Sequence, residues 1–296
     1  MKERLFPPQP AAVLKATLDR FLAQTDVQPL IAHDPVQLVR AYADPEDQEV
    51  AGLLVAGLAY GRARSIRERA GAALALLGPH PARAIADPRR RRKLDGFVYR
   101  FQGGADLPRF LEAIAILRRA RGSLARAFVD GVEPQDPDYL PALQRFARAV
   151  RGAIPGVPLT PGLRFLLPDG PGANKRLCLW LRWMVRGPDA VDLGSFGRLL
   201  PGELSPGRLV IPLDTHIERI GRFIGLTDRR GGGAQTARDI TAALRAIRPD
   251  DPLAYDLALC HLGIAGACPR KRDLVRCQGC PIRGVCRLGT PPKGWR

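Results

Sequence analysis

The sequence predicts an all-α protein, and two observations support this fold class. Apolar residues recur at intervals of three and four over most of the chain, whereas the strict alternation typical of strands is short and scarce. Capping residues and Gly-Pro pairs also lie where these periodic stretches begin and end. The expected helices cover residues 14–22, 44–58, 64–78, 106–119, 123–130, 138–151, 160–167, 173–186, 236–248 and 252–263.

The residues at the helix ends justify these boundaries. Acidic residues open the helix at 44–58, where they favour the positive end of the helix dipole, and its residues 50–58 are so apolar that we expect them to be buried. The next helix should stop at Gly78, before Pro79. We expect Asp106 and Ser123 to cap two further helices and Pro252 to lie in the first turn of the last one.

The composition bounds the function. The chain has 296 residues, 46% of them hydrophobic, and no stretch long enough to predict a membrane span. The N-terminus lacks the apolar segment of a signal peptide, so we expect a cytoplasmic, nucleoid-associated protein. With 46 Lys and Arg against 29 Asp and Glu, the net charge of +17 favours a nucleic-acid partner, although Arg-rich codon usage would also raise it.

A Gly-rich hairpin between two predicted helices is the first segment with chemistry. Thr160 caps the first helix, residues 168–172 turn the chain, and the second helix begins near Ala173. Glycines at 170 and 172 allow the backbone to approach a phosphate, and the amides of the second helix favour an anion. The alternative to a phosphate-binding hairpin is an ordinary turn between two helices. Four residues place positive charge beside the hairpin: Lys175, Arg176, Arg182 and Arg186.

The second segment is the corner at Asp214. Residues 209–213 are apolar, and a helix with Ile217, Ile220 and Phe223 on its buried face follows. Thr215 and Glu218 fit a capping box. Taken alone, this pattern makes Asp214 an acid near a helix start, but a carboxylate there can also serve catalysis.

The third segment holds clustered cysteines. Cys268, Cys277, Cys280 and Cys286 give the spacing C-x8-C-x2-C-x5-C. Four thiolates in one short loop suit a [4Fe-4S] cluster, and tetrahedral zinc is the alternative occupant. We expect Gly279 and Gly284 to provide tight turns and the two other cysteines, 178 and 260, to be core residues.

The three segments follow one another along the chain as hairpin, LDTH corner (213–216) and cysteine loop. This order resembles that of the helix-hairpin-helix DNA glycosylases of the endonuclease III and adenine glycosylase type. Further stretches look like an uncharacterised bacterial family at the edge of this superfamily, over roughly residues 35–290: GLAYGRARSI (57–66), YRF (99–101), KRLCLWLRWMVR (175–186), VDLG (191–194), IPLDTH (211–216) and YDLAL (255–259). The first cysteine gap is two residues longer than in endonuclease III, and residues 187–210 form a longer insertion.

The resemblance implies a two-lobed helix-hairpin-helix glycosylase fold with the active site in the cleft between the lobes. Residues 36–210, with the hairpin at 160–186, would form a helical barrel lobe. Residues 1–35 and 211–296 would form an iron–sulfur cluster lobe. The implied protein is a DNA N-glycosylase of base excision repair, a monomer that flips a damaged or modified base out of double-stranded DNA.

The resemblance also implies roles for individual residues. Asp214 falls on the catalytic aspartate, which stabilises the positive charge that develops on the sugar. Lys175 lies one residue later than the lysine of bifunctional relatives, which leaves open whether it forms a Schiff base in an abasic-site lyase or contacts phosphate. The implied DNA contacts are Gly170, Gly172, Lys175 and Arg176 at the hairpin, Tyr60 or Arg62 as the residue that fills the gap left by the base, and Arg270, Lys271, Arg272 and Arg276 beside the cluster.

Two other functions remain open at the sequence level. One is a non-catalytic iron–sulfur protein that recognises unusual DNA structure. The other is an RNA-directed or zinc-dependent module. The sequence names no target base, because the residues that shape a base pocket are dispersed along the chain.

Overall fold

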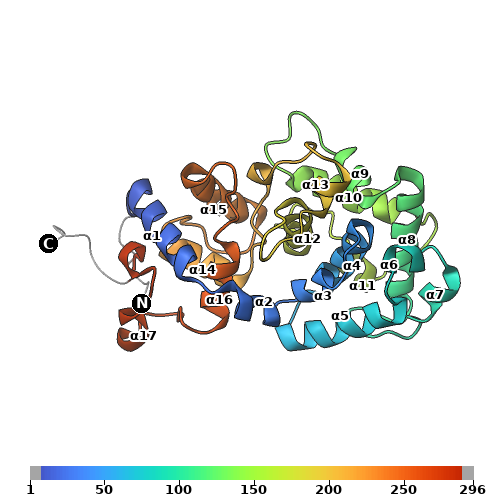
Figure 1. The fold of residues 1–296 in the computed structure, drawn as a ribbon, viewed down its shortest axis with the longest axis horizontal. Coiled ribbons are helices and arrows are strands. Elements are labelled where there is room, and N and C mark those ends of the chain that lie inside the picture. Colours follow the sequence, from blue (N-terminus) through green and yellow to red (C-terminus); the bar gives the residue numbers. More distant parts are fainter. Residues whose placement is uncertain (1–7, 289–296) are drawn as a thin grey trace. The chain divides into compact units, whose positions relative to one another are not determined.

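A computed structural model describes residues 8–288, and within this range the protein consists of helices and loops, with no named strand (Figure 1). The predicted all-α class is therefore confirmed. None of the helices in this range is long and apolar enough to cross a membrane.

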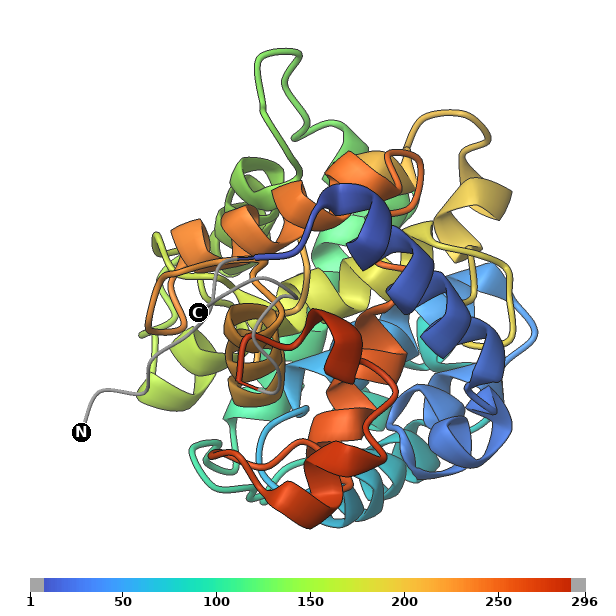
Figure 2. The ribbon, with the colours of Figure 1, turned by 90° about the vertical axis from the view of Figure 1, so that its left-hand side faces the viewer.

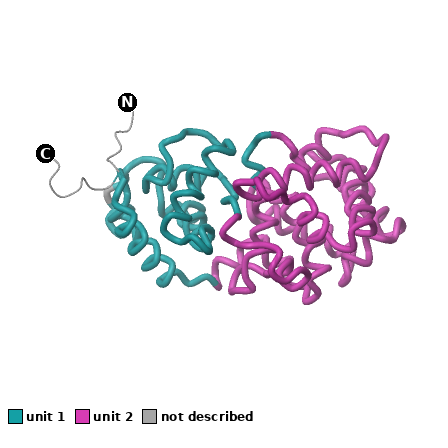
Figure 3. The backbone as a smooth tube through the Cα atoms, turned by 90° about the horizontal axis from the view of Figure 1, so that it is seen from above, with its two compact units in different colours: residues 1–27, 171–175, 209–296 teal, residues 28–170, 176–208 magenta. Residues whose placement is uncertain are grey.

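The chain divides into two compact units (Figure 3). Unit 1 comprises residues 1–27, 171–175 and 209–296, and unit 2 comprises residues 28–170 and 176–208. Relative to the boundaries expected from the sequence, residues 28–35 lie in unit 2, whereas the hairpin tip at 171–175 and residues 209–210 lie in unit 1. The tip is held there by an isolated bridge between Gly172 and Gly233. The first seven and last eight residues of the expected cluster lobe lie outside the described residues.

Unit 2 is organised around α4 (Pro45–Gly57). The carboxylate of Asp44 accepts a hydrogen bond from the Glu46 amide and begins this helix, and every residue from Asp47 to Gly57 is buried. A Cβ atom added at Gly52 would lie 2.9 Å from Cε of Met184, so the absence of a side chain lets α12 approach closely. The apolar run expected to be buried is thus the centre of a helical core.

The remaining helices of unit 2 surround α4 or extend from it. Contacts with α4 are made by α3, α5, α6, α9 and α13. The helices are α2 (Val27–His33, whose first residue lies in unit 1), α3 (Val36–Arg40), α5 (Ala63–Leu77), α6 (Pro81–Ala84), α7 (Pro88–Arg92), α8 (Asp106–Arg121), α9 (Leu124–Val129), α10 (Leu140–Gly152), α11 (Pro161–Leu166), α12 (Lys175–Val185, which begins in unit 1), α13 (Ser195–Leu199) and the short 3-10 helix η1 (Pro206–Arg208).

The insertion at 187–210 belongs to unit 2 up to residue 208 and contributes to its core. Its helix α13 packs on α4, and Phe196 is fully buried. Asp192 is also fully buried and pairs with Arg182 and Arg186 of α12 and its C-terminal end. These two arginines, which the sequence placed beside the hairpin as positive charge, therefore neutralise a buried carboxylate.

Unit 1 contains the two termini of the described chain. Its helices are α1 (Ala11–Gln24), α14 (Thr215–Phe223), α15 (Ala234–Ile247), α16 (Asp256–Ile264), α17 (Leu274–Gln278) and the short 3-10 helix η2 (Arg283–Val285). The helix α1 packs on α15 and on η2, so the N-terminal helix lies beside the C-terminal loop (Figure 2). α14 contacts both α15 and α16.

Helix ends show where the sequence predictions succeeded and failed. Ser123 caps α9 by accepting from the Arg126 amide, as predicted. Asp106 is not a cap: it is the first residue of α8, and its carboxylate accepts from the Gly103 amide and the Thr160 hydroxyl. Pro252 lies in a turn before α16, which begins at Asp256. Side-chain partners outside the helix decide the role of Asp106, and a linear pattern does not contain them.

Candidate functional site

The segment that leads to Asp214 is extended and buried. Leu209, Val210, Ile211 and Leu213 are each at most 5% exposed. The Ile211 amide donates to the Thr241 hydroxyl, and Arg245 donates to the Leu209 carbonyl. Both partners belong to α15, so this helix holds the backbone immediately before Asp214.

Asp214 is the N-cap of α14. Its Oδ1 accepts hydrogen bonds from the amides of His216 (2.8 Å) and Ile217 (2.7 Å). The predicted capping box was wrong in this respect: Thr215 is the first helical residue, and Glu218 instead accepts from the Gly231 amide. The cap uses one carboxylate oxygen and fixes it at the positive end of the helix.

The second oxygen of Asp214 faces Cys260 of α16. The Cys260 thiol donates to Oδ2 with a sulfur–oxygen distance of 3.4 Å. Burial raises the pKa of Cys260 well above its ordinary value, and the charges of Asp214 and Asp256 raise it further. Cys260 was expected to be a core residue, but its thiol contacts the candidate catalytic carboxylate.

Lys175 belongs to the same neighbourhood. This residue begins α12 at the end of the hairpin and lies in unit 1 with Asp214 and Cys260. Its positive charge is close enough to lower the pKa of the Cys260 thiol, against the effect of the two carboxylates. The hairpin lysine and the corner aspartate therefore both influence the ionisation of one cysteine, although 39 positions separate them in the sequence.

The hairpin tip exposes its backbone. Gly170, Pro171 and Gly172 are exposed, and neither glycine has a positive φ. Added Cβ atoms at Gly170 and Gly172 would meet nothing closer than 4.0 Å. Asn174 supplies the left-handed turn instead, with φ of 46°. The glycines thus leave room for a group to approach the backbone, but the turn does not require them.

Arg176 is not free to contact a phosphate, although the sequence suggested such a contact. Its guanidinium donates to the carbonyls of Gly57 (2.9 Å) and Phe165, and its Cζ lies 3.7 Å from the centroid of the Phe165 ring. Burial lowers the pKa of Arg176 to about 10. This arginine stabilises unit 2.

Tyr60 is likewise engaged inside unit 2. Its hydroxyl donates to the Tyr99 carbonyl (2.8 Å) and contacts the Gln102 side chain. Burial raises the pKa of Tyr60 to about 12. Of the two residues expected to fill the gap left by a flipped base, Arg62 is exposed just before α5, whereas Tyr60 is held in an aromatic cluster with Phe101 and Phe165.

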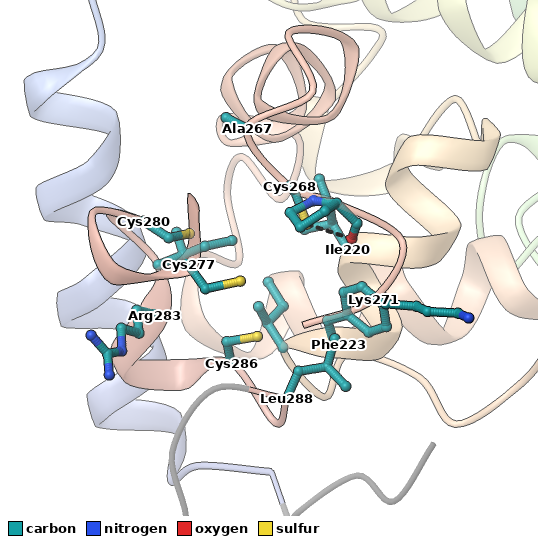
Figure 4. Close-up of a pocket in the computed structure, with 13 residues that line it drawn as sticks. Ile220, Phe223, Ala267, Cys268, Lys271, Cys277, Cys280, Arg283, Cys286 and Leu288 are labelled. Atoms are coloured by element: carbon teal, nitrogen blue, oxygen red, sulfur yellow. Dashed lines mark hydrogen bonds between the residues drawn. The ribbon is translucent and has the colours of Figure 1, made fainter. Parts of the chain in front are cut away.

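The four loop cysteines line one pocket in unit 1. Figure 4 shows their sulfurs around the pocket, with those of Cys277 and Cys286 pointing into it. Ile220, Phe223 and Ile224 of the α14 region form an apolar wall. The pKa of Cys268 is raised to about 11, mainly by burial and in smaller part by the neighbouring Cys280 and Cys286.

The donor chemistry of the cysteine loop suits a resident metal. All four thiols are free of disulfides, and the apolar wall shields one side of the pocket, which suits thiolate ligation of iron. Among the described residues, however, no three His, Cys, Asp or Glu side chains form a group that could hold a metal ion. The loop therefore offers a suitable donor set around one pocket without a closed coordination sphere.

The long first gap of the cysteine loop contains a capped helix. The carboxylate of Asp273 accepts from the amides of Val275 and Arg276 and begins α17, which carries Cys277. The glycines expected to make tight turns, 279 and 284, do not have positive φ, whereas Gly266 does, at 70°. The four expected DNA-contacting cations of this loop are all exposed: Arg270, Lys271, Arg272 and Arg276.

Sequence reasoning missed the residues that join these elements. A Cβ atom at Gly263 would lie 2.6 Å from Cβ of His216, so α14 and α16 meet at this glycine. Arg219 donates to the Cys268 carbonyl (3.0 Å) and contacts His216 at 3.3 Å, which ties α14 to the first loop cysteine. Gly263 inside a helical pattern was the one available signal, because a glycine there indicates close packing.

Comparison with known proteins identifies a family but no activity. No curated protein and no solved structure matches the chain. The family described as "Protein of unknown function (DUF2400)" matches residues 34–265, a range that includes the hairpin, Asp214 and Cys260 and ends before Cys268. Because this match covers well over half of the sequence, the chain belongs to that family.

Proposed function

We propose that this protein is a DNA N-glycosylase with a structural iron–sulfur cluster. The observation that carries the proposal is the neighbourhood of Asp214, Cys260 and Lys175 in unit 1. A fixed carboxylate and an amine are the two groups that cleavage of a glycosidic bond followed by strand cleavage would use. The resemblance of the three motifs to helix-hairpin-helix glycosylases gives this pair its assignment.

The proposed hydrolysis uses Asp214 as an electrostatic group. As the bond between the base and C1′ breaks, the base leaves with the bonding electrons and takes up a proton, and positive charge develops on the sugar. The carboxylate of Asp214 stabilises that charge, and water adds to C1′ with loss of its proton. Because Oδ1 is bound to the α14 amides, Oδ2 is the oxygen that would face the sugar.

Lys175 would serve the lyase step. A neutral amine attacks C1′ of the abasic sugar, water leaves, and the resulting imine permits elimination of the 3′ phosphate. The exposed tip at 170–172 would contact the DNA backbone beside it, since its residues are exposed and its two glycines carry no side chain that would keep a phosphate away.

The test is a screen for base release over a panel of duplexes with damaged and modified bases. Asp214→Asn should lower the rate of release at least about 100-fold, because an amide cannot balance the sugar charge. Lys175→Ala should retain release but lose the covalent adduct that borohydride traps on abasic DNA. Unchanged release by Asp214→Asn would contradict the catalytic role. Tight DNA binding without release from any duplex would favour the non-catalytic alternative.

The cluster is proposed as a structural group held by Cys268, Cys277, Cys280 and Cys286. When bound, it would supply rigid cross-linking of the loop and no chemistry of the hydrolysis. Protein purified without oxygen should be brown, with four irons per chain and broad absorbance near about 400 nm. Cys277→Ser should lose that absorbance, whereas Cys178→Ser, at a buried cysteine of unit 2, should keep it. A colourless protein that contains one zinc would reject the iron–sulfur assignment.

A further inference from the structure

The two oxygens of the Asp214 carboxylate have different partners. Oδ1 accepts from two backbone amides at 2.8 and 2.7 Å, and these donors belong to the helix that Asp214 caps. Oδ2 accepts from the Cys260 thiol at 3.4 Å. A thiol is a weak donor, so Oδ2 keeps most of its capacity to interact with a positive charge. The same hydrogen bond fixes the orientation of the carboxylate.

The environment of Cys260 keeps its thiol in the protonated, donating form. Asp214 faces it from the start of α14, Asp256 lies one turn before it in α16, and the charge of Lys175, the first residue of α12, also acts on it. Burial raises the pKa of Cys260, the two carboxylates raise it further, and Lys175 opposes them. The balance favours S–H, and a thiolate beside Asp214 would repel the carboxylate.

Close packing of two helices sets the contact. Gly263 lies one turn after Cys260 in α16, and His216 lies two residues after Asp214 in α14. A side chain at Gly263 would overlap His216, whose Cβ and Nδ1 both lie 2.6 Å from the Cβ position. The backbone approach at this point therefore holds the thiol within reach of the carboxylate.

We propose that Cys260 is a positioning residue that holds Oδ2 of Asp214 in the orientation needed to face the sugar. The inference rests on the proposed glycosylase function for its consequence, and on the contact geometry for its existence. It assigns to Cys260 a role that no sequence motif indicated, since the four loop cysteines account for the metal-binding pattern without it.

Substitutions of Cys260 can keep or remove the hydrogen-bond donor to Asp214. Cys260→Ser retains an O–H group at the same branch point, whereas Cys260→Ala removes the donor and leaves a small cavity. Cys178→Ala is the matched control, because Cys178 is also buried and its replacement removes the same volume from unit 2. Thermal unfolding of all three variants separates the loss of packing from the loss of the hydrogen bond.

The kinetic test measures single-turnover base release and substrate affinity separately. Cys260→Ala should lower the rate of release about 10-fold with DNA affinity unchanged, because a carboxylate that rotates misplaces one oxygen by a fraction of an ångström. Cys260→Ser should recover release to within about 3-fold of the native protein, and Cys178→Ala should match the native protein. If Cys260→Ala released the base at the rate of the native protein, the role of Cys260 would be overturned and the proposed function would still stand.

A spectroscopic test does not depend on activity. The S–H stretching band of Cys260 can be isolated as the infrared difference between the native protein and Cys260→Ala. In Asp214→Asn, the side-chain oxygen would remain on the α14 amides and the NH₂ group would face the thiol, so the hydrogen bond is lost and the band should move to higher wavenumber. An unmoved band would overturn the contact. If the native protein releases no base, the proposed function fails, and this band alone decides whether Cys260 holds Asp214.

Discussion

Two carboxylates in this protein accept hydrogen bonds from two backbone amides at the start of a helix, but they differ in how these bonds and their other contacts are arranged. Glu49 of α4 accepts from the amides of Leu124 and Ala125 at the start of α9, and Asp214 accepts from two amides at the start of α14. In Glu49 the two amides bind different oxygens, and Arg118 also donates to Oε1 at 2.8 Å. In Asp214 both amides bind Oδ1, and Oδ2 meets only a thiol among the described residues.

The difference separates a structural carboxylate from one suited to chemistry. Glu49 is fully buried, and each of its oxygens accepts from a strong donor, so solvent and other molecules do not reach it. Asp214 is partly exposed and keeps one weakly bound oxygen. Fixing one oxygen and leaving the other available is the arrangement that electrostatic stabilisation of a cationic sugar requires.

The largest expected effect is a loss of stability when Glu49 is replaced. Glu49→Gln should lower the free energy of unfolding by about 3 kcal/mol or more, because it removes the buried negative charge that pairs with Arg118 and turns one amide contact into a clash between two donors. Denaturation in guanidinium chloride, followed by circular dichroism, measures the change. A loss below about 1 kcal/mol would show that Glu49 does not stabilise the contact of α4 with α9 and Arg118.

Asp214 supplies the matched control for that measurement. Asn is as good an N-cap as Asp, so Asp214→Asn should change the free energy of unfolding by less than about 0.5 kcal/mol, whereas Asp214→Ala should cost about 1 kcal/mol. Both variants should nevertheless lose base release. Equal stability losses in Glu49→Gln and Asp214→Asn would remove the distinction between the two carboxylates.

Much of the fold could be predicted because it depends on local periodicity. The burial of α4 followed from an uninterrupted apolar run, and the start of α9 followed from Ser123. The short helices α6, α7 and α13 did not follow, because four or five residues carry too little periodicity to distinguish a helix from a turn. Tertiary contacts such as the packing of α13 on α4 stabilise them.

The candidate site was predictable in its residue types but not in its connections. Asp214, Lys175 and the loop cysteines stand out by spacing and context, so the sequence named them. The roles of Cys260 and Arg219 depend on the approach of α14 to α16 and to the cysteine loop, which no local pattern encodes. The sequence predicted that the charge of Arg176 is available to a phosphate. In the structure its guanidinium donates to two backbone carbonyls of unit 2, and the sequence does not reveal these tertiary contacts.

The cations differ in the same way as the two carboxylates, because some are already bound within the protein and others are exposed. Arg176 donates to two backbone carbonyls and stacks on Phe165, so its charge is already used. Lys271 and Arg272 are exposed in the cysteine loop, and the loop holds one acidic residue, Asp273, between positions 268 and 288. Only the second group has donors available for DNA phosphates.

The smallest expected effect concerns the salt dependence of DNA binding. Each lysine or arginine that neutralises a phosphate contributes about 0.9 to the slope of log K against log salt concentration. The double variant Lys271→Ala with Arg272→Ala should therefore reduce the steepness of that slope by about 2 on duplex DNA, independently of its sequence. Arg176→Ala, measured at a temperature where it remains folded, should leave the slope unchanged and lower stability instead, since its hydrogen bonds lie within unit 2. A change of slope in Arg176→Ala, or none in the double variant, would reverse the assignment of which cations face the nucleic acid.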